Sequence, residues 1–228
     1  MAQDKQLPSI ILLDRNRFDF HGAHIAGIVT CVFPPEVVSD MEVINRQAFR
    51  AHIQSFLQVN KISPTKILVV LSPAICFETL LPTQTQLEGD AITKNFVDTV
   101  PFEDVVYRTY KSQKGNTVIA VNAAIIDALK IELSSFGHTV LALVPATMFG
   151  ILHNQTGLDV KTAQILSENA LSSLSLDLTT QVAKTSMPVH QEAPLVALSH
   201  NRRLVVLLCM FLVLILILIV LLKSTVLV

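Results

Sequence analysis

The chain has 228 residues, of which 51% are hydrophobic and 15% are charged, and its formal net charge is −1. A nucleic-acid-binding protein normally carries a basic stripe, and no run of basic residues stands out here, so nucleic acid is excluded as a partner. The hydrophobic fraction is high for an ordinary soluble domain, whereas the charged fraction is high for a polytopic membrane protein, so the average combines two kinds of segment.

The first part of the chain predicts three strands in succession. Ser9–Leu13 is a short apolar run, and Arg17–His21 alternates between polar and apolar residues with period two. Ile25–Phe33 is a longer β-branched run that two prolines end. Because the joints between these runs are short, we expect an antiparallel meander.

A helix and a buried strand are predicted next. Over Glu42–Val59, helical spacing is shown by the apolar residues Ile44, Phe49, Ile53, Phe56 and Leu57. Lys66–Leu71 is apolar after its first residue, which is typical of a central strand covered on both faces. Leu87–Val100 then indicates a second helix, because a proline follows it.

The next segment predicts a hairpin and the clearest helix of the chain. Val105–Lys111 and Thr117–Val121 are strand-like, and the sequence Lys-Gly-Asn between them is typical of a hairpin turn. Asn122–Phe136 shows helical spacing, with Asn122 placed to cap the helix and Gly137 placed just beyond its end.

The remaining elements complete an α/β pattern. His138–Val144 is another buried strand, and Pro145–Leu152 and Val160–Leu174 are helix-like. This order of elements predicts an α/β domain over residues 1–174 with a mixed sheet of five to six strands. Residues 175–203, which are rich in Ser, Thr, Gln and Ala, are predicted to form a flexible tether.

A single membrane anchor is predicted after the tether. From Leu204 to Leu222 there are 19 consecutive apolar residues, which as a helix would reach roughly 28 Å, close to the hydrocarbon thickness of about 30 Å. Two arginines precede this run and one lysine follows it, which favours a cytoplasmic N-terminal domain. The N-terminus is polar, so we expect no signal peptide. The sequence therefore predicts a single-pass membrane protein, with residues 223–228 as a short exterior tail.

Metal and nucleophile chemistry has little support in the residues. Cys31 and Cys76 lie in strand-like stretches without CxxC spacing, so we expect buried thiols in a reducing compartment. His21 and His24 have no third ligand spaced near them, so turn-exposed histidines are the better interpretation. Ser72 follows a predicted strand without a GxSxG motif, which favours a strand-end turn. No metal and no cofactor are predicted.

Three segments together resemble a known family. They are Phe96–Val106 (FVDTVPFEDVV), Thr117–Gly137 and His138–Gly150 (HTVLALVPATMFG). In this order they are similar to the cytoplasmic actin-like subunits of type IV pilus and type II secretion platforms, of the PilM and GspL type. The resemblance implies an actin- or ribonuclease-H-like half-domain. It also implies a scaffold that contacts an assembly ATPase and other inner-membrane platform proteins.

The sequence departs from actin-type ATPases at the place where phosphate would bind. Those proteins use Asp-x-Gly after the first strand, because glycine lets backbone amides approach the phosphate. Here the residues are Asp14-Arg15-Asn16. The departure argues against ATP binding and more strongly against hydrolysis, so the chain is not expected to be an enzyme.

An acidic cluster offers a surface for partners. Phe102, Glu103 and Asp104 lie together, with Asp98 nearby. Paired carboxylates could serve acid–base chemistry, and a solvated loop is the simpler interpretation, but protein docking is the functional interpretation that we prefer.

The resulting hypothesis is a membrane-anchored scaffold or adaptor that acts by docking other proteins without catalysis. Two alternatives stay open. The first is an anchored enzyme with its site at the carboxyl ends of Lys66–Leu71 and His138–Val144, where ligands bind in open α/β sheets. The second is a eukaryotic tail-anchored adaptor.

Overall fold

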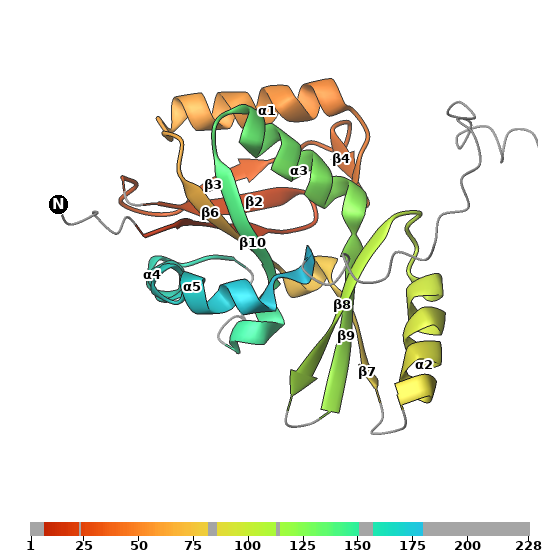
Figure 1. Cartoon of the computed structure of the whole chain (residues 1–228). Coiled ribbons are helices and arrows are strands. Elements are labelled where there is room, and N and C mark those ends of the chain that lie inside the picture. Colours follow the sequence, from red (N-terminus) through yellow and green to blue (C-terminus); the bar gives the residue numbers. More distant parts are fainter. Residues whose placement is uncertain (1–6, 23, 82–85, 113–114, 151–156, 180–228) are drawn as a thin grey trace, which may run out of the picture. The chain divides into compact units, whose positions relative to one another are not determined.

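A computed structural model of the chain describes residues 7–22, 24–81, 86–112, 115–150 and 157–179 (Figure 1). The chain divides into two compact units, Met1–Ser186 and Met187–Val228, and all of these described residues belong to the first. Within the described ranges, no helix has both the length and the apolar character needed to cross a bilayer. The predicted anchor at 204–222 and the tail at 223–228 lie outside those ranges.

A five-stranded mixed sheet forms the centre of the unit, in the order β10-β6-β1-β2-β3. Its strands are β1 (Ser9–Leu13), β2 (Arg17–His21), β3 (Val29–Val32), β6 (Lys66–Leu71) and β10 (Thr139–Pro145). Strands β10, β6 and β1 run parallel, whereas β1, β2 and β3 form an antiparallel meander. The predicted meander and the predicted central position of β6 are both confirmed.

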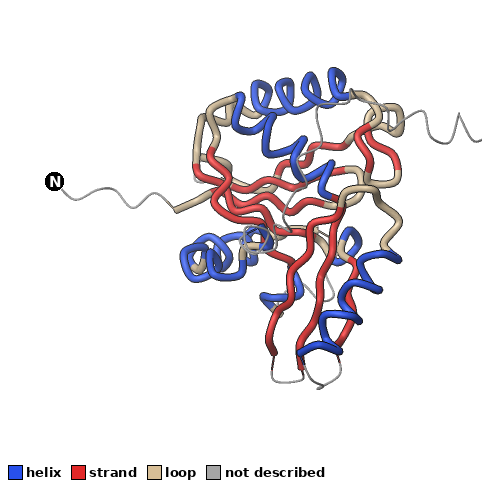
Figure 2. The backbone as a smooth tube through the Cα atoms, turned by 45° about the vertical axis from the view of Figure 1, so that its right-hand side comes forward, coloured by secondary structure: helices blue, strands red, loops and turns tan. Residues whose placement is uncertain are grey.

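Helices cover both faces of this sheet, as Figures 1 and 2 both show. Helices α1 (Arg46–Val59) and α3 (Ala123–Ser135) lie on one face, and α4 (Val160–Glu168) with α5 (Ala170–Ser173) lies on the other. The first face packs a core that is rich in aromatic side chains, including Phe18, Phe20, Phe33, Phe49 and Phe56. The second face packs a smaller aliphatic cluster.

The first helix begins later than the sequence pattern predicts. Two strands of two residues each, β4 (Val38–Ser39) and β5 (Glu42–Val43), form a short hairpin, and its second strand occupies the start of the predicted helix. Helix α1 begins at Arg46 because the Asn45 side chain accepts a hydrogen bond from the Ala48 amide at 3.0 Å and caps it. Ile44 is therefore 59% exposed and does not belong to the buried face.

The predicted mixed sheet is present with five strands, and beside it the structure has a second sheet that the element order did not predict. Strands β7 (Phe77–Leu81), β9 (Gly115–Asn122) and β8 (Val105–Ser112) form a separate antiparallel sheet, beside which lies α2 (Gln86–Thr99). The predicted hairpin is confirmed as β8 and β9, but the sequence analysis missed β7. A short 3₁₀ helix, η1 (Pro73–Ile75), separates β7 from β6.

The folded unit continues past the predicted boundary at residue 174. After η2 (Ala146–Phe149), α4 and α5, a short helix η3 (Leu174–Leu176) packs on the unit. Leu178 is fully buried in the main core. The predicted tether therefore begins at least five residues too early, because the apolar side chain of Leu178 has a place in the core. The rest of that tether, residues 180–203, lies outside the described ranges.

Both helices above the sheet end with the same Schellman motif. At the end of α1, the amide of Ile62 donates to the Leu57 carbonyl at 2.9 Å and the amide of Lys61 donates to the Gln58 carbonyl at 3.1 Å. The end of α3 repeats both bonds, with Gly137 in the place of Lys61. The two residues have positive φ values of 52° and 84°. Glycine adopts this conformation without strain, whereas lysine does not.

These two helix ends predict stability changes of opposite sign. Lys61→Gly should raise the free energy of unfolding by about 0.5–1 kcal/mol, because the left-handed strain is removed. Gly137→Ala should lower it by about 1–2 kcal/mol, because a Cβ would be strained at φ 84° and would meet the Pro64 side chain at 3.3 Å. Urea unfolding followed by circular dichroism measures both. As a control, Gly89→Ala in the open interior of α2 should be stabilising, and an equal gain at Gly137 would contradict the assignment.

His138 follows the Schellman motif of α3 and predicts a pH dependence. It is 4% exposed, and its Nδ1 accepts a hydrogen bond from the Thr65 amide at 3.3 Å. Burial lowers the pKa of His138. The unfolded chain therefore binds a proton that the folded chain does not, and stability should fall as the pH drops below about 6.5, by at most about 1.4 kcal/mol per pH unit. Urea midpoints at pH 7.5 and 5.5 test this. His138→Gln should weaken the acid sensitivity, and an unchanged pH profile would refute the attribution.

Candidate functional site

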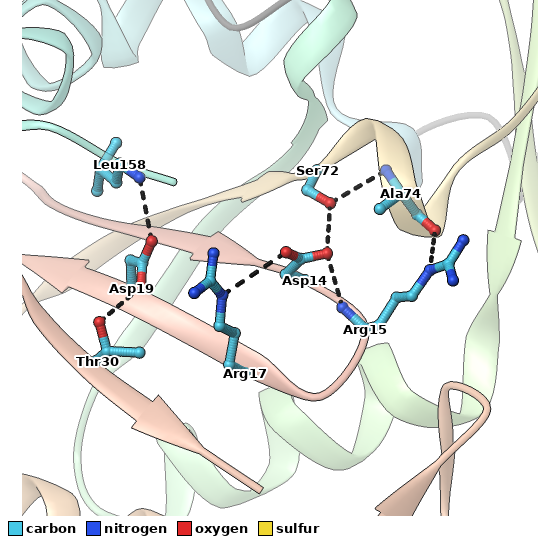
Figure 3. A network of polar contacts seen from close by, with 8 residues as sticks. All are labelled: Asp14, Arg15, Arg17, Asp19, Thr30, Ser72, Ala74 and Leu158. Carbon is cyan, nitrogen blue, oxygen red and sulfur yellow. Dashed lines mark hydrogen bonds and ion pairs between the residues drawn. The ribbon is translucent and has the colours of Figure 1, made fainter. Parts of the chain in front are cut away.

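The carboxyl ends of β1 and β6 meet at one edge of the five-stranded sheet (Figure 3). Because the two strands are parallel and Leu13 lies opposite Leu71, the residues that follow them are neighbours in space. These residues are Asp14 in the turn between β1 and β2 and Ser72 at the start of η1. The Ser72 amide donates to the Leu13 carbonyl at 2.9 Å, which ties the two strand ends together.

The carboxylate of Asp14 is engaged by groups of the chain itself. Its Oδ1 accepts hydrogen bonds from the Ser72 hydroxyl and from the Arg15 amide, each at 2.9 Å. Its Oδ2 lies 3.7 Å from the Nε of Arg17. The hydroxyl of Ser72 in turn accepts from the Ala74 amide at 3.2 Å, so it caps η1. Asp14 therefore joins the turn after β1 to the turn after β6.

A second carboxylate, Asp19, lies on β2 and is only 5% exposed. Its Oδ1 accepts from the Thr30 hydroxyl at 2.8 Å, and its Oδ2 accepts from the Leu158 amide at 3.0 Å. A Cβ on Gly157 would come within 3.2 Å of the same Oδ2, so a larger residue there would have to displace the carboxylate by a few tenths of an ångström. Asp19 thus fastens the entrance of α4 to the sheet.

Asp19 did not emerge from the sequence analysis as a site residue. In the strand Arg17–His21, alternation places Arg17, Asp19 and His21 on one face, which sequence reasoning assigns to solvent. The available signal was an acidic residue in mid-strand, which is unusual for strands in general. Only the packing of Leu158 against it shows that the carboxylate is buried.

The residues at this edge do not fit a metal-bound nucleotide. The turn after β1 has no glycine to let backbone amides approach a phosphate, and Arg15 extends across it to donate to the Ala74 carbonyl at 3.2 Å. The Asp14 oxygens that would hold a metal-bound water are already hydrogen-bonded or paired with Arg17. No group of three or more metal-ligating side chains occurs among the described residues.

The carboxyl ends of β6 and β10, where the enzyme alternative places its site, lead directly or after one residue into the short helices η1 and η2. Ile75 of η1 and Ala146 of η2 are buried there. The Thr147 hydroxyl donates to a Glu78 carboxylate oxygen at 3.0 Å, which joins η2 to β7. A cavity of about 50 Å³ lies at the opposite ends of the strands, and its lining includes Ser9, Gly22, His24, Lys61 and Thr65.

The histidines and thiols are placed much as the sequence analysis expects. His24 is exposed, as predicted, whereas His21 is half-buried and its Nδ1–H donates to the Gly27 carbonyl at 2.9 Å. Cys31 is buried, and burial raises its pKa to about 12. Burial also raises the pKa of the half-buried Cys76, with a smaller contribution from the nearby Glu78 carboxylate. Both thiols therefore stay protonated and unreactive at neutral pH.

The predicted docking residues lie between α2 and β8. Phe102 is half-buried and packs edge-to-face on Phe77, with ring centroids 5.6 Å apart. Glu103 and Asp104 are exposed. The Asp104 carbonyl accepts from the amide of Ala123, the first residue of α3, at 2.9 Å. This bond places the segment that carries the two carboxylates beside the amino end of α3, where the helix dipole favours negative charge.

Further carboxylates lie at the same helix end. The side chain of Asn122, which caps α3, donates to the Met41 carbonyl at 3.1 Å, and this bond brings the β4–β5 turn beside the helix. Several exposed acidic residues belong to these neighbouring segments and to α3 itself, and we call them the acidic rim: Asp40, Glu42, Glu103, Asp104 and Asp127. Within the described part of the chain, none of the five lies within 4 Å of a basic side chain.

The polar network predicts that Asp19 is worth more to stability than Asp14. Asp19→Ala should lower the free energy of unfolding by roughly 2–3 kcal/mol, because the Leu158 amide would be buried without a partner. Asp14→Ala should lower it by about 1 kcal/mol, because this carboxylate is partly exposed and water can replace it. Urea unfolding measures both, with the exposed Asp98→Ala as a neutral control. A gain in stability at Asp19 would instead be typical of a strained functional residue.

No family model matches the sequence, and no curated protein is similar to it in sequence. Solved structures that are similar in fold include a pilus complex, a secretion-system component and a protein of unknown function. The PilM-PilN type IV pilus biogenesis complex matches 66% of this chain and 50% of its own, with 14% identity and a TM-score of 0.45. The cytoplasmic domain of EpsL, an inner-membrane component of the type II secretion system of Vibrio cholerae, matches 60% and 56%, with 14% identity and a TM-score of 0.37.

The third is a protein of unknown function with an actin-like ATPase fold from Bacteroides thetaiotaomicron, which matches 61% of this chain and 54% of its own, with 12% identity and a TM-score of 0.31. The chain spans about half the length of these structures. The resemblance to pilus and secretion subunits that the sequence predicts is therefore found again by structure. With TM-scores below 0.5, these similarities leave the activity and the partners of the chain to be argued from its own residues.

Proposed function

We propose that the chain is a membrane-anchored scaffold or adaptor of a type IV pilus or type II secretion-like assembly platform, which acts by docking proteins and not by catalysis. The observation that carries this proposal is the closed polar network at the carboxyl ends of β1 and β6. At that edge, Asp14, Ser72 and Arg15 bind one another. The chain uses its own groups where an actin-type ATPase would hold phosphate.

Docking in this proposal uses the acidic rim together with Phe102. Exposed carboxylates without a basic neighbour stay available to a partner, and they favour one with a basic surface. Phe102 adds apolar area beside them. The platform subunits and assembly ATPase that the sequence resemblance implies are the partners we propose.

The proposed anchor is the apolar run Leu204–Leu222, with the domain on the cytoplasmic side of the inner membrane. This part of the proposal rests on the sequence, since the run lies outside the described ranges. The residues between Thr179 and the run would then set the distance between the domain and the membrane.

A charge reversal tests the docking role. In the full chain, Glu103→Lys should reduce recovery of co-expressed platform subunits by about tenfold, because a lysine would repel a basic partner surface. Glu168→Lys is the matched control, since it makes the same charge change at an exposed position on α4. Equal recovery with both variants would contradict docking at the acidic rim.

The same purified chain tests the absence of nucleotide chemistry. Millimolar ATP with Mg²⁺ should leave its melting temperature unchanged, because a ligand that does not bind the folded state cannot stabilise it. A saturable rise in melting temperature would overturn the non-catalytic part of the proposal, and it would leave the docking result unaffected.

A further inference from the structure

The last described residues, 174–179, cross from one sheet to the other, and we call them the C-terminal clasp. On one side they bind β8 of the three-stranded sheet. The guanidinium of Arg108 donates to the carbonyls of Asp177 and Ser175, the latter at 2.8 Å. The hydroxyl of Tyr110 donates to the Leu176 carbonyl at 3.0 Å. Two side chains of β8 thus hold three consecutive carbonyls of the clasp.

On its other side the clasp binds β10 of the five-stranded sheet. An Oδ1 of Asp177 accepts a hydrogen bond from the Leu143 amide at 2.9 Å. Strand β10 is an edge strand, so the carboxylate satisfies an amide that would otherwise face outward from the sheet. Leu178 adds a fully buried side chain to the main core. Taken together, the four consecutive residues 175–178 therefore connect the two sheets.

Arg108 stabilises the engaged clasp less than its two hydrogen bonds alone would suggest. Its guanidinium stacks on the Tyr110 ring at 5.2 Å, and its Nε is buried without a hydrogen-bond partner among the described residues. A buried donor without a partner is destabilising, which offsets part of what the two charged hydrogen bonds contribute. Burial also raises the pKa of Tyr110, so its phenol remains a donor at neutral pH. The clasp is thus specific in its contacts but only modestly stabilised.

We propose that the clasp is a conformational switch at the end of the folded unit. In its engaged state the clasp joins the two sheets and covers the edge of β10, and in its released state the contacts with β8 and with β10 are lost together. The bonds to β8 and to β10 come from neighbouring residues, so neither set can be lost without loosening the other. Release would expose an unpaired strand edge, the feature through which sheets add further strands. This inference does not depend on the docking role proposed above.

Hydrogen exchange of the full chain, followed by mass spectrometry, tests the switch. Arg108→Met should speed exchange about tenfold in the clasp, in β8 and in peptides covering Leu143, although the hydrogen bonds of Arg108 go to the clasp and not to β10. Asp177→Ala should speed the same three regions. The matched control is Arg50→Met, because Arg50 also stacks on an aromatic ring and meets an acid, but on α1. It should leave all three regions unchanged.

The double variant Arg108→Met/Asp177→Ala separates the switch from two independent contacts. If one release event underlies both sets of bonds, each substitution weakens the same engaged state, so the double variant should exchange faster than either single variant in all three regions, by up to about a hundredfold. Slow exchange at Leu143 in Arg108→Met would overturn the proposal, and so would a double variant in which each region exchanges only as fast as in the single variant that affects it. Faster exchange throughout α1 would likewise overturn it, since it would show global destabilisation. If Arg108→Met does not fold, Arg108→Lys makes the same test, because a lysine lacks the planar fork that binds two carbonyls.

Discussion

Strand β6 is the constraint on which the rest of the structure depends. Its residues from Ile67 to Leu71 are all 0% exposed, and it lies between two parallel partners, β1 and β10. A strand buried on both faces requires cover on both, which α1 and α3 supply on one side and α4 on the other. Parallel pairing also requires long crossovers. The crossover from β6 to β10 contains the whole three-stranded sheet, so the second sheet is an insertion in a connection that the first sheet needs.

The same parallel pairing explains why the strand-end network is closed. Because Leu13 lies opposite Leu71, the turn after β1 and the turn after β6 arrive at one place with their polar groups facing each other. Asp14 accepts from Ser72, and Arg15 donates across to Ala74. The carboxyl ends of the strands, where other open α/β sheets bind ligands, are here connected to each other by hydrogen bonds within the chain. This satisfaction of polar groups by the chain itself is the physical basis for proposing docking and not catalysis.

Strand β8 connects the two surfaces to which we assign roles. The acidic residues Glu103 and Asp104 directly precede it, and Arg108 and Tyr110 further along it hold the C-terminal clasp. Since alternate residues of a strand face opposite ways, the two residues that hold the clasp share one face, which is turned toward the five-stranded sheet. Part of the proposed docking surface and the residues that hold the clasp therefore lie on β8 and on the loop that directly precedes it.

Local pattern alone determined the central strand, the meander, the hairpin and the caps of α3, because continuous apolar runs, turn sequences and capping residues act over a few positions. It also predicted an apolar anchor that lies outside the described ranges. Tertiary structure decided the rest. Only the packing of Gly157 and Leu158 shows that Asp19 is buried, and only Arg108 and Leu143 show that residues 175–179 belong to the folded unit. These contacts join residues 34 to 139 positions apart, a range over which periodicity carries no information, so side-chain complementarity in the folded chain had to select them.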